Sequence, residues 1–199
     1  MYICKTECKT MQSIPLGTRG NFSFSGFYRN INETRRLLKD NIFLLLALLS
    51  NRPLNILLAD DDAGSREIFI EAIGDIAPRV KVNVAPNGQK LMSILLSETT
   101  PLPDIVFLDL NMPLKSGREC LLEIRNNERL KGIPVIIYST SSNDEHIEDT
   151  YEGGANFYLI KPDSFGDLKL IAKNILSFDW VKPIWPERGK FVLLPNQFK

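Results

Sequence analysis

The sequence predicts an α/β protein with a doubly wound parallel sheet, in which helices cover both faces of five strands. Three observations lead to this fold class. From Leu54 onward, strand-like and helical patterns alternate along the chain. Four of the strand-like runs are apolar throughout, as parallel strands buried on both faces require. The segments between them have the spacing of amphipathic helices, and the connections are short enough for right-handed crossovers.

The predicted strands differ in pattern, and the difference places one of them at an edge of the sheet. Residues 80–84 (Val-Lys-Val-Asn-Val) alternate strictly between apolar and polar side chains, so this strand is expected to be half exposed. The other four strands are continuous apolar runs and are expected in the interior of the sheet. They span residues 55–60, 104–109, 134–139 and 156–161.

Apolar residues between the strands recur at helical spacing. Asn87 and Asp163 precede two of these stripes and are the predicted N-caps, because short polar side chains accept hydrogen bonds from the free N–H groups of a first turn. The stripes are Phe69, Ala72, Ile73 and Ile76, then Leu91, Ile94 and Leu95, and finally Leu168, Ile171, Ala172 and Ile175.

Length and charge restrict the class of protein. The 199 residues allow one domain with a full core plus extensions. Apolar residues make up 44% of the chain, and 24 basic residues balance 24 acidic ones. A net charge of zero gives no general attraction to nucleic acid or to an anionic membrane, so neither is an expected partner.

The cysteines indicate a reducing compartment. Their number is low and odd, which provides no disulfide framework and favours the cytoplasm. Cys4 and Cys8 have the spacing of half a zinc site, but the sequence offers no second Cys/His pair to complete four ligands. Cys120 lies among apolar residues and is expected to be buried as a small apolar side chain.

A single apolar run, residues 42–49, raises the question of a membrane segment. Its eight residues fall well short of the roughly 18 that span a bilayer. It also starts too late for the core of a signal peptide. The run continues a helical stripe that starts at Leu37, so a buried helix face is favoured over an anchor.

Charged residues at three strand ends narrow the function most. Asp60 and Asp61 follow the first predicted strand, Asp109 follows the third, and Lys161 follows the fifth. The carboxyl ends of parallel strands meet at the crevice where open α/β sheets bind ligands. Clustered carboxylates repel each other and therefore call for a cation, whereas a fixed ammonium group calls for an anion.

Four motifs, in order, resemble the receiver domain of two-component response regulators over about residues 54–178. They are Leu-Ala-Asp-Asp-Asp at 58–62, Phe-Leu-Asp-Leu-Asn-Met-Pro at 107–113 with Gly117 shortly after, Pro-Val-Ile-Ile-Tyr-Ser-Thr at 134–140, and Gly-Ala-Asn-Phe-Tyr-Leu-Ile-Lys-Pro at 154–162. The resemblance implies a flavodoxin-like (βα)5 fold with strand order 2-1-3-4-5. That order agrees with the edge position inferred for residues 80–84.

The resemblance also implies roles for the acidic residues. Asp109 would be the phosphoacceptor, because a carboxylate can attack phosphorus and form an acyl phosphate. Mg²⁺ would be the cofactor, since it favours oxygen ligands and supports phosphoryl transfer. Asp61 and Asp109 would bind it directly, Asp60 largely through water, and Asn111 through its backbone carbonyl.

Three further residues carry roles in the family pattern. Lys161 would pair with Asp109 before transfer and with a phosphoryl oxygen afterwards. Ser139 would donate its hydroxyl hydrogen to the phosphoryl group, and Ser139 and Tyr158 would form the conformational switch, which needs an element with two arrangements.

Each assignment has a structural alternative. Residues 60–62 have the composition of an acidic first turn of a helix, favoured by capping and by the helix dipole. Lys161 would then only end a strand, and Tyr158 would be an ordinary strand aromatic. His146, the single histidine, lacks partners with metal-ligand spacing and is predicted on an exposed helical face.

Thr140 departs from the family, which usually has Ala or Gly after the strand-end serine. A branched side chain there is expected to narrow access to the phosphoryl group and so to slow its hydrolysis.

The flanking segments complete the predicted organisation: an extension at 1–52 with a helical pattern near 32–49, the receiver at 53–178, and a tail at 179–199 rich in Trp and Pro. The tail is too short for an output domain with its own core. It is expected to pack on the receiver, with partner binding as the alternative. The extension is either a helix-bearing arm or an effect of start-site choice.

The leading hypothesis is therefore a single-domain response regulator that takes a phosphoryl group from a histidine kinase or a histidine phosphotransfer protein. It would not be an enzyme beyond self-phosphorylation and slow autodephosphorylation. Its output would be altered binding to a partner protein through the fourth and fifth helical segments and the fifth strand. The same face is the candidate surface for a homodimer. A phosphorylation-independent interaction module is the alternative. The haloacid dehalogenase pattern Asp-x-Asp-x-Thr/Val is not met at Asp60 or at Asp109.

Overall fold

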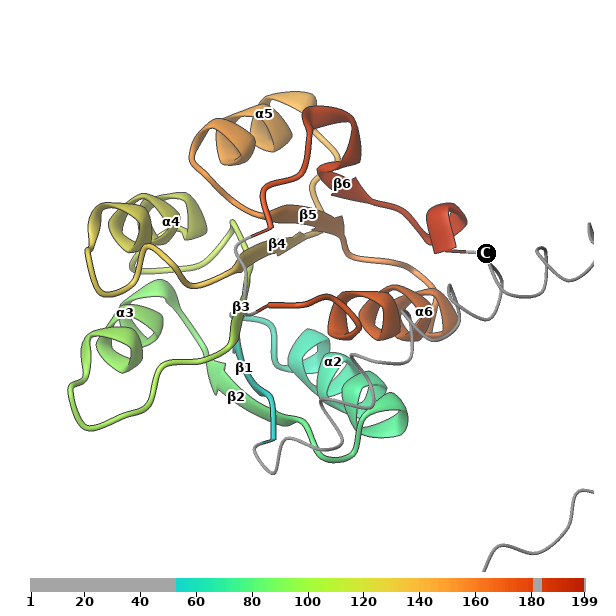
Figure 1. Cartoon of the computed structure of the whole chain (residues 1–199), viewed down its shortest axis with the longest axis horizontal. Coiled ribbons are helices and arrows are strands. Elements are labelled where there is room, and N and C mark those ends of the chain that lie inside the picture. The colour runs from blue at the N-terminus through green and yellow to red at the C-terminus, as the bar shows by residue number, and fades with distance from the viewer. Residues whose placement is uncertain (1–52, 181–183, 199) are drawn as a thin grey trace, which may run out of the picture. The chain divides into compact units, whose positions relative to one another are not determined.

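The computed structural model describes residues 53–180 and 184–198. Five strands and five helices alternate along the chain from β1 to α6 (Figure 1). They are β1 (Asn55–Ala59), α2 (Ala63–Ile76), β2 (Lys81–Ala85), α3 (Gly88–Leu96), β3 (Ile105–Leu108), α4 (Gly117–Asn126), β4 (Val135–Ser139), α5 (Asp144–Glu152), β5 (Phe157–Ile160) and α6 (Phe165–Leu176). The short elements η1 (Arg188–Lys190), β6 (Val192–Leu193) and η2 (Pro195–Phe198) follow.

The strands form one parallel sheet in the order β2-β1-β3-β4-β5-β6. This confirms the doubly wound fold and the order 2-1-3-4-5 for the first five strands. β2 lies at an edge, as its alternating pattern predicts, and Val84 there is 40% exposed. The expectation of five strands was incomplete, because the tail adds β6. Two residues are too short a run to give a strand pattern in the sequence.

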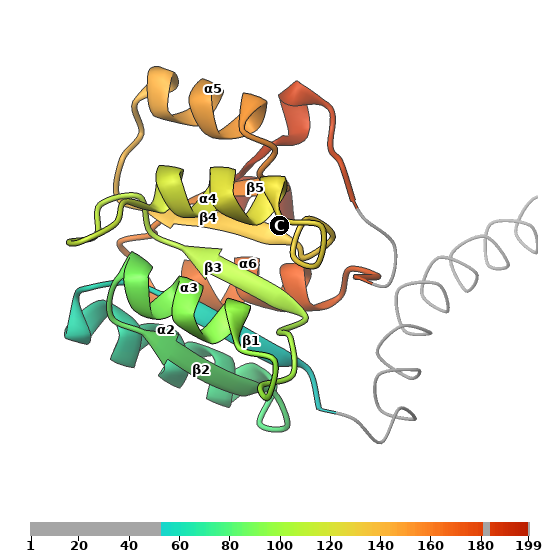
Figure 2. The same ribbon diagram turned by 90° about the vertical axis from the view of Figure 1, so that its left-hand side faces the viewer.

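Helices cover both faces of the sheet (Figures 1 and 2). Helices α2 and α6 lie on one face, and α3, α4 and α5 lie on the other. Side chains of a strand alternate between the two faces, so Leu57 and Ala59 enter one core while Ile56 and Leu58 enter the other. Burial on both faces explains why the central strands are apolar at every position.

The helix starts confirm one predicted cap and correct another. Asn87 caps α3, where its side chain accepts a hydrogen bond from the backbone N–H of Lys90 at 2.8 Å. The prediction of Asp163 for α6 is wrong. Ser164 holds that position and accepts from the N–H of Asp167. Both residue types cap well, so the local sequence did not distinguish two adjacent candidates.

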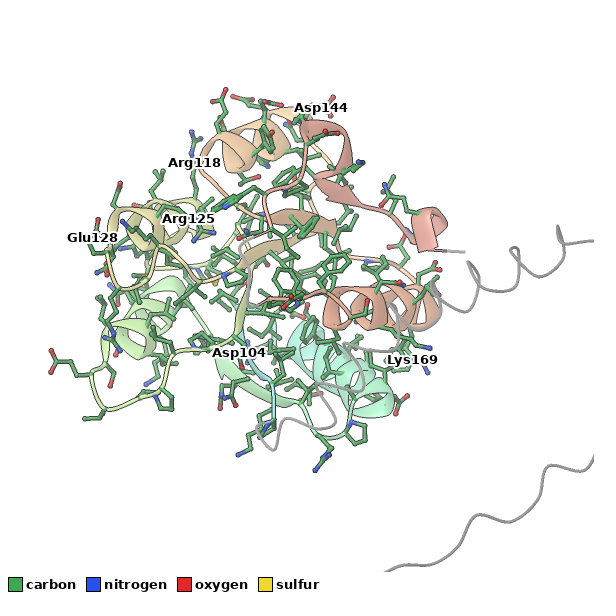
Figure 3. The ribbon with its side chains drawn as sticks, in the orientation of Figure 1. Asp104, Arg118, Arg125, Glu128, Asp144 and Lys169 are labelled. Atoms are coloured by element: carbon green, nitrogen blue, oxygen red, sulfur yellow. The ribbon has the colours of Figure 1, made fainter. Side chains whose placement is uncertain are left out.

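Polar side chains anchor the strands at the end of the sheet where β1 and β3 begin, opposite the strand ends that carry the predicted acids. Figure 3 labels two of them, Asp104 and Arg125. Asp104 accepts a hydrogen bond from the backbone N–H of Asn55 at 2.8 Å, which joins the starts of β1 and β3. Arg125 of α4 donates to the carbonyl of Gly154 at 2.6 Å and to Oδ1 of Asn156 at 2.9 Å, just before β5. These bonds join the start of β1 to that of β3, and α4 to the segment that precedes β5.

The described part of the tail packs on the sheet, as expected. β6 pairs with β5, and the backbone N–H of Tyr158 donates to the carbonyl of Phe191 at 2.9 Å. The Phe191 side chain is fully buried, with its ring centroid 5.1 Å from that of Tyr151 and 6.2 Å from that of Tyr158. The tail therefore covers the outer edge of β5.

No helix within residues 53–180 and 184–198 is both long enough and apolar enough to cross a membrane. The predictions for the extension, including the run at 42–49, lie outside the described residues.

Candidate functional site

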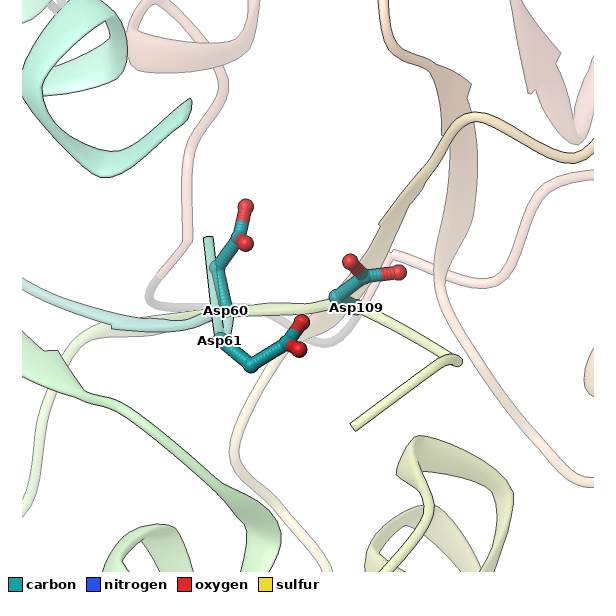
Figure 4. Close-up of side chains that lie close together, drawn as sticks. All are labelled: Asp60, Asp61 and Asp109. Carbon is teal, nitrogen blue, oxygen red and sulfur yellow. The ribbon is translucent and has the colours of Figure 1, made fainter. Parts of the chain in front are cut away.

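Three carboxylates meet at the carboxyl ends of β1 and β3 (Figure 4). The strands are neighbours with Ala59 opposite Leu108, and the N–H of Asp109 donates to the carbonyl of Ala59 at 2.8 Å. The residues that follow each strand are therefore adjacent. Carboxylate oxygens of Asp60, Asp61 and Asp109 all lie within 4.8 Å of one another. The predicted convergence of these acids is confirmed.

Lys161 joins two of the acids from the end of β5. Its Nζ lies 2.8 Å from Oδ2 of Asp60 and 3.0 Å from Oδ2 of Asp109. Burial lowers the pKa of this lysine, but its hydrogen bonds to the two carboxylates outweigh burial, and the net pKa lies above the ordinary 10.5. The ammonium group therefore stays charged and offsets part of the negative charge of the cluster.

Asp60 is the most constrained of the three acids. Its side chain is buried, and its oxygens also accept hydrogen bonds from the Ser65 hydroxyl at 2.7 Å and from the N–H of Asp62 at 3.0 Å. Asp61, by contrast, is exposed to solvent. The two neighbouring acids thus present different numbers of free oxygen lone pairs to any incoming cation.

Residues 60–62 could also have formed only the acidic first turn of a helix, and this alternative interpretation holds for one of them. Asp62 is the N-cap of α2, and its Oδ1 accepts from the backbone N–H of Ser65 at 2.6 Å. Capping therefore accounts for the third aspartate, while the first two belong to the carboxylate cluster.

The loop after β3 turns back close to Asp109. Gly117 begins α4, and a Cβ at this position would lie 2.0 Å from the carbonyl oxygen of Asp109. Glycine is thus required by close backbone approach. Leu114 has a positive φ of 69° and is 71% exposed. The N–H of Asn111 donates to Oδ1 of Asp109 at 3.3 Å, which places the predicted carbonyl ligand within the same turn.

Ser139 and Tyr158, the predicted switch residues, are both fully buried and both contact Ser141. The Oγ of Ser139 accepts from the N–H of Ser141 at 3.3 Å, and the Tyr158 hydroxyl donates to the carbonyl of Ser141 at 2.9 Å. Burial raises the pKa of Tyr158 above its ordinary value, so the phenol remains a hydrogen-bond donor. Thr140, between the two serines, is exposed.

The sequence interpretation missed Ser65 and misplaced His146. Ser65 donates to Asp60, and its place five residues after that acid was the available signal. His146 was predicted on an exposed face, but it is half buried and its Nδ1 lies 2.8 Å from Oγ of Ser141. The signal there was a lone histidine in the first turn of the helix that follows Ser139.

A family model and the most similar curated proteins indicate the same family for this chain. The model of the response regulator receiver domain matches residues 56–173. The response regulator Rcp1 of Synechocystis sp. is 34% identical over 68% of this chain and 94% of its own length. The probable methanogenesis regulatory protein FilR2 of Methanothrix harundinacea is 33% identical over 63% of this chain and 83% of its own.

Solved structures give the same result. The Mn²⁺-bound form of Rcp1 superposes with a TM-score of 0.59 at 33% identity and covers 68% of this chain and all of that one. The phosphorylated cyanobacterial phytochrome response regulator RcpA superposes with a TM-score of 0.60 at 32% identity, covering 65% of this chain and 95% of that one.

Proposed function

The chain belongs to the response regulator receiver domain family of two-component signalling, and from this membership we propose that Asp109 accepts a phosphoryl group from a histidine kinase or a histidine phosphotransfer protein. The observation that carries the proposal is the position of Asp109: its carboxylate lies beside two other acids and 3.0 Å from the Lys161 ammonium. Such a site presents a nucleophile, ligands for a cation and a fixed positive charge together.

The transfer step uses these groups together with the Ser139 hydroxyl. A carboxylate oxygen of Asp109 attacks the phosphorus, a P–O bond forms, and the P–N bond to the donor histidine breaks with its electron pair left on the imidazole nitrogen. Lys161 then moves from the carboxylate of Asp109 to a phosphoryl oxygen. Ser139 donates its hydroxyl hydrogen to another phosphoryl oxygen. The Lys161 ammonium and the Ser139 hydroxyl therefore both stabilise the negative charge of the phosphoryl group.

The donor set fits Mg²⁺, which favours oxygen ligands and is bound by one or two carboxylates with several waters retained. We assign Asp61 and Asp109 as direct ligands, Asp60 as a ligand through water, and Asn111 as a carbonyl ligand. The hydrogen bonds that already occupy both oxygens of Asp60 support its indirect role. When bound, the ion supplies positive charge to the phosphoryl oxygens. The Mn²⁺-bound form of the relative Rcp1 supports a divalent ion in this family.

The output is proposed to be a change in protein contacts. Tyr158 reports the state of the site because its hydroxyl is held by Ser141, two residues beyond Ser139. The surface of α5, β5 and α6 is the proposed contact face for a partner or for a second copy of the chain. Since β6 occupies the edge of β5, a molecule that approaches this edge meets the tail first.

The protein is proposed to act as a switch and not as an enzyme with a separate substrate. Its own chemistry is self-phosphorylation from small donors and slow autodephosphorylation. We place it in the cytoplasm, on the low and odd cysteine count and on the free, buried thiol of Cys120.

Incubation with acetyl phosphate and Mg²⁺, followed by intact mass measurement, tests the proposal. Wild type should gain the mass of one phosphoryl group, and Asp109→Asn should gain none. Asp163→Asn, which alters an exposed acid two residues after Lys161 in the sequence, is the control and should react like wild type. Borohydride reduction and peptide mapping then locate the acyl phosphate. Absence of an adduct in wild type, or an equal adduct in Asp109→Asn, would overturn the proposal in favour of a phosphorylation-independent module.

A further inference from the structure

One loop residue joins the two predicted switch residues. Ser141 lies between β4 and α5, and its backbone contacts both of them: its N–H donates to Oγ of Ser139 at 3.3 Å, and its carbonyl accepts from the Tyr158 hydroxyl at 2.9 Å. A displacement of the Ser141 backbone would therefore move the acceptor of the Tyr158 bond and the donor of the Ser139 bond together.

The Ser141 side chain is in turn held by His146. The Oγ of Ser141 lies 2.8 Å from Nδ1 of His146 and accepts a hydrogen bond from the N–H of Asn143 at 3.3 Å. The imidazole is carried by the first turn of α5. That turn is fixed, because Ile147 is 5% exposed and Thr150 donates its hydroxyl hydrogen to the carbonyl of His146 at 2.8 Å.

The link between Ser141 and His146 does not depend on the charge of the imidazole. A serine hydroxyl has one donor hydrogen and two acceptor lone pairs, and Asn143 uses one lone pair. A neutral ring without a proton on Nδ1 accepts the hydroxyl hydrogen. A ring protonated at Nδ1 donates to the remaining lone pair. Both states keep Oγ and Nδ1 in contact.

We propose that His146 is a positioning residue for phosphoryl binding by Ser139. Its contact with Ser141 fixes the loop so that the Ser141 N–H occupies one lone pair of the Ser139 hydroxyl. This bond orients the hydroxyl so that, once transfer has occurred, its hydrogen is donated to a phosphoryl oxygen. The same contact holds the carbonyl that receives Tyr158. This inference rests on the proposed role of Asp109 as phosphoacceptor, and it adds a residue outside the family motifs to the switch.

The test compares three substitutions in the untagged 199-residue chain. His146→Phe keeps a ring but removes the hydrogen bond, Ser141→Ala removes the same bond from its other end, and His146→Asn is the rescue, since its amide reaches the position of Nδ1. Glu148→Gln is the control on the same helix. It removes a charge from the exposed ion pair with Arg188.

Two quantities are measured: the rate of phosphorylation by acetyl phosphate with Mg²⁺, and amide hydrogen exchange at residue 141 in the unphosphorylated protein, each exchange rate being divided by the intrinsic rate of that residue type. His146→Phe and Ser141→Ala should each slow phosphorylation and speed exchange about three- to tenfold, the range expected for loss of one neutral hydrogen bond. The double variant should show no further loss. His146→Asn should restore both quantities to within about twofold of wild type, and Glu148→Gln should change neither.

Because the chain has one histidine, labelling with ¹⁵N-histidine gives the resonances of a single imidazole in an NMR spectrum. Ser141→Ala should shift the Nδ1 resonance of that ring. The inference is overturned if Ser141→Ala leaves that resonance, the exchange and the rate unchanged, or if His146→Asn is as slow as His146→Phe. Lack of any adduct in wild type would instead overturn the role of Asp109, so the two failures are distinguished.

Discussion

The ammonium of Lys161 lies 3.0 Å from Oδ2 of Asp109, although the two residues are 52 positions apart. Asp109 follows β3 and Lys161 follows β5, and β4 lies between these strands in the sheet. The long lysine side chain therefore spans the end of β4 to reach the acids. This pairing converts a cluster of repelling carboxylates into a site with a compensating charge.

Lys161→Met should lower the free energy of unfolding by about 3 kcal/mol, because removal of one partner leaves buried carboxylates without their cation. Side-chain exposure is 13% for Lys161 and 0% for Asp60, so solvent screens the pair weakly. Urea unfolding in EDTA measures the loss. The control is Lys169→Met, whose pair with Asp75 is on the surface and should cost less than about 1 kcal/mol.

The stabilising contribution of Lys161 should depend on pH. The pKa of Lys161 is raised above 10.5 in the folded protein, so its stabilising contribution is complete below that pH and is lost as the pH rises through the folded pKa. The difference in unfolding free energy between wild type and Lys161→Met should therefore be constant at neutral pH and narrow above 10.5. A difference that is already narrowing near neutral pH would contradict this assignment.

Asp61→Asn should weaken Mg²⁺ binding while stabilising the metal-free protein. Loss of one carboxylate from three within 4.8 Å relieves repulsion by about 1 kcal/mol. Saturating Mg²⁺ should then stabilise wild type by about 2.7 kcal/mol at a hundredfold excess over Kd, and the variant by clearly less. Thermal unfolding in EDTA and in a MgCl₂ series measures both effects. An equal rise of thermal stability with Mg²⁺ in the two proteins would show that Asp61 is not a ligand. Asp163→Asn is the control and should respond to Mg²⁺ like wild type.

Thr140→Ala should shorten the half-life of the phosphorylated protein about threefold, equivalent to ~0.7 kcal/mol in the barrier. The exposed threonine follows Ser139, where its branched side chain is expected to restrict the approach of water to the phosphoryl group. Decay of the adduct after removal of acetyl phosphate gives the half-life. An unchanged half-life would refute the predicted effect, and Ser142→Ala in the same exposed loop should leave it unchanged.

Gly117→Ala should destabilise the fold by about 2 kcal/mol or more, because the added Cβ would lie 2.0 Å from the carbonyl oxygen of Asp109 and the backbone must shift. Gly74→Ala is a matched helical control. Its Cβ would meet nothing within 4 Å, so it should stabilise the protein by about 0.5–1 kcal/mol through helix propensity. Urea unfolding compares them, and equal stability of Gly117→Ala and wild type would contradict the close approach.

Phe191→Ala should cost about 3 kcal/mol if the tail is part of the folded unit, since the side chain is fully buried. Leu194→Ala nearby removes a side chain that is 38% exposed and should cost less than about 1 kcal/mol. Both values come from urea unfolding. A negligible effect at Phe191 would mean that the tail does not stabilise the receiver in solution.

Much of the fold was predictable from local pattern. Continuous apolar runs identify β1, β3, β4 and β5, because a strand buried on both faces has no position for a polar side chain. The alternation at residues 80–84 identified the edge strand for the converse reason. The cap of α6 was missed by one residue, where two adjacent side chains have similar capping ability.

The sequence by itself determined the fold class and which acids follow which strands, because strand period and strand ends are local properties of the chain. The tertiary structure alone decided that Lys161 binds Asp60 from 101 positions away, that the tail adds a sixth strand beside β5, and that His146 holds Ser141. The first two contacts depend on strand order, and the third on how α5 packs. Non-local packing leaves no periodic signal in the residues that make it.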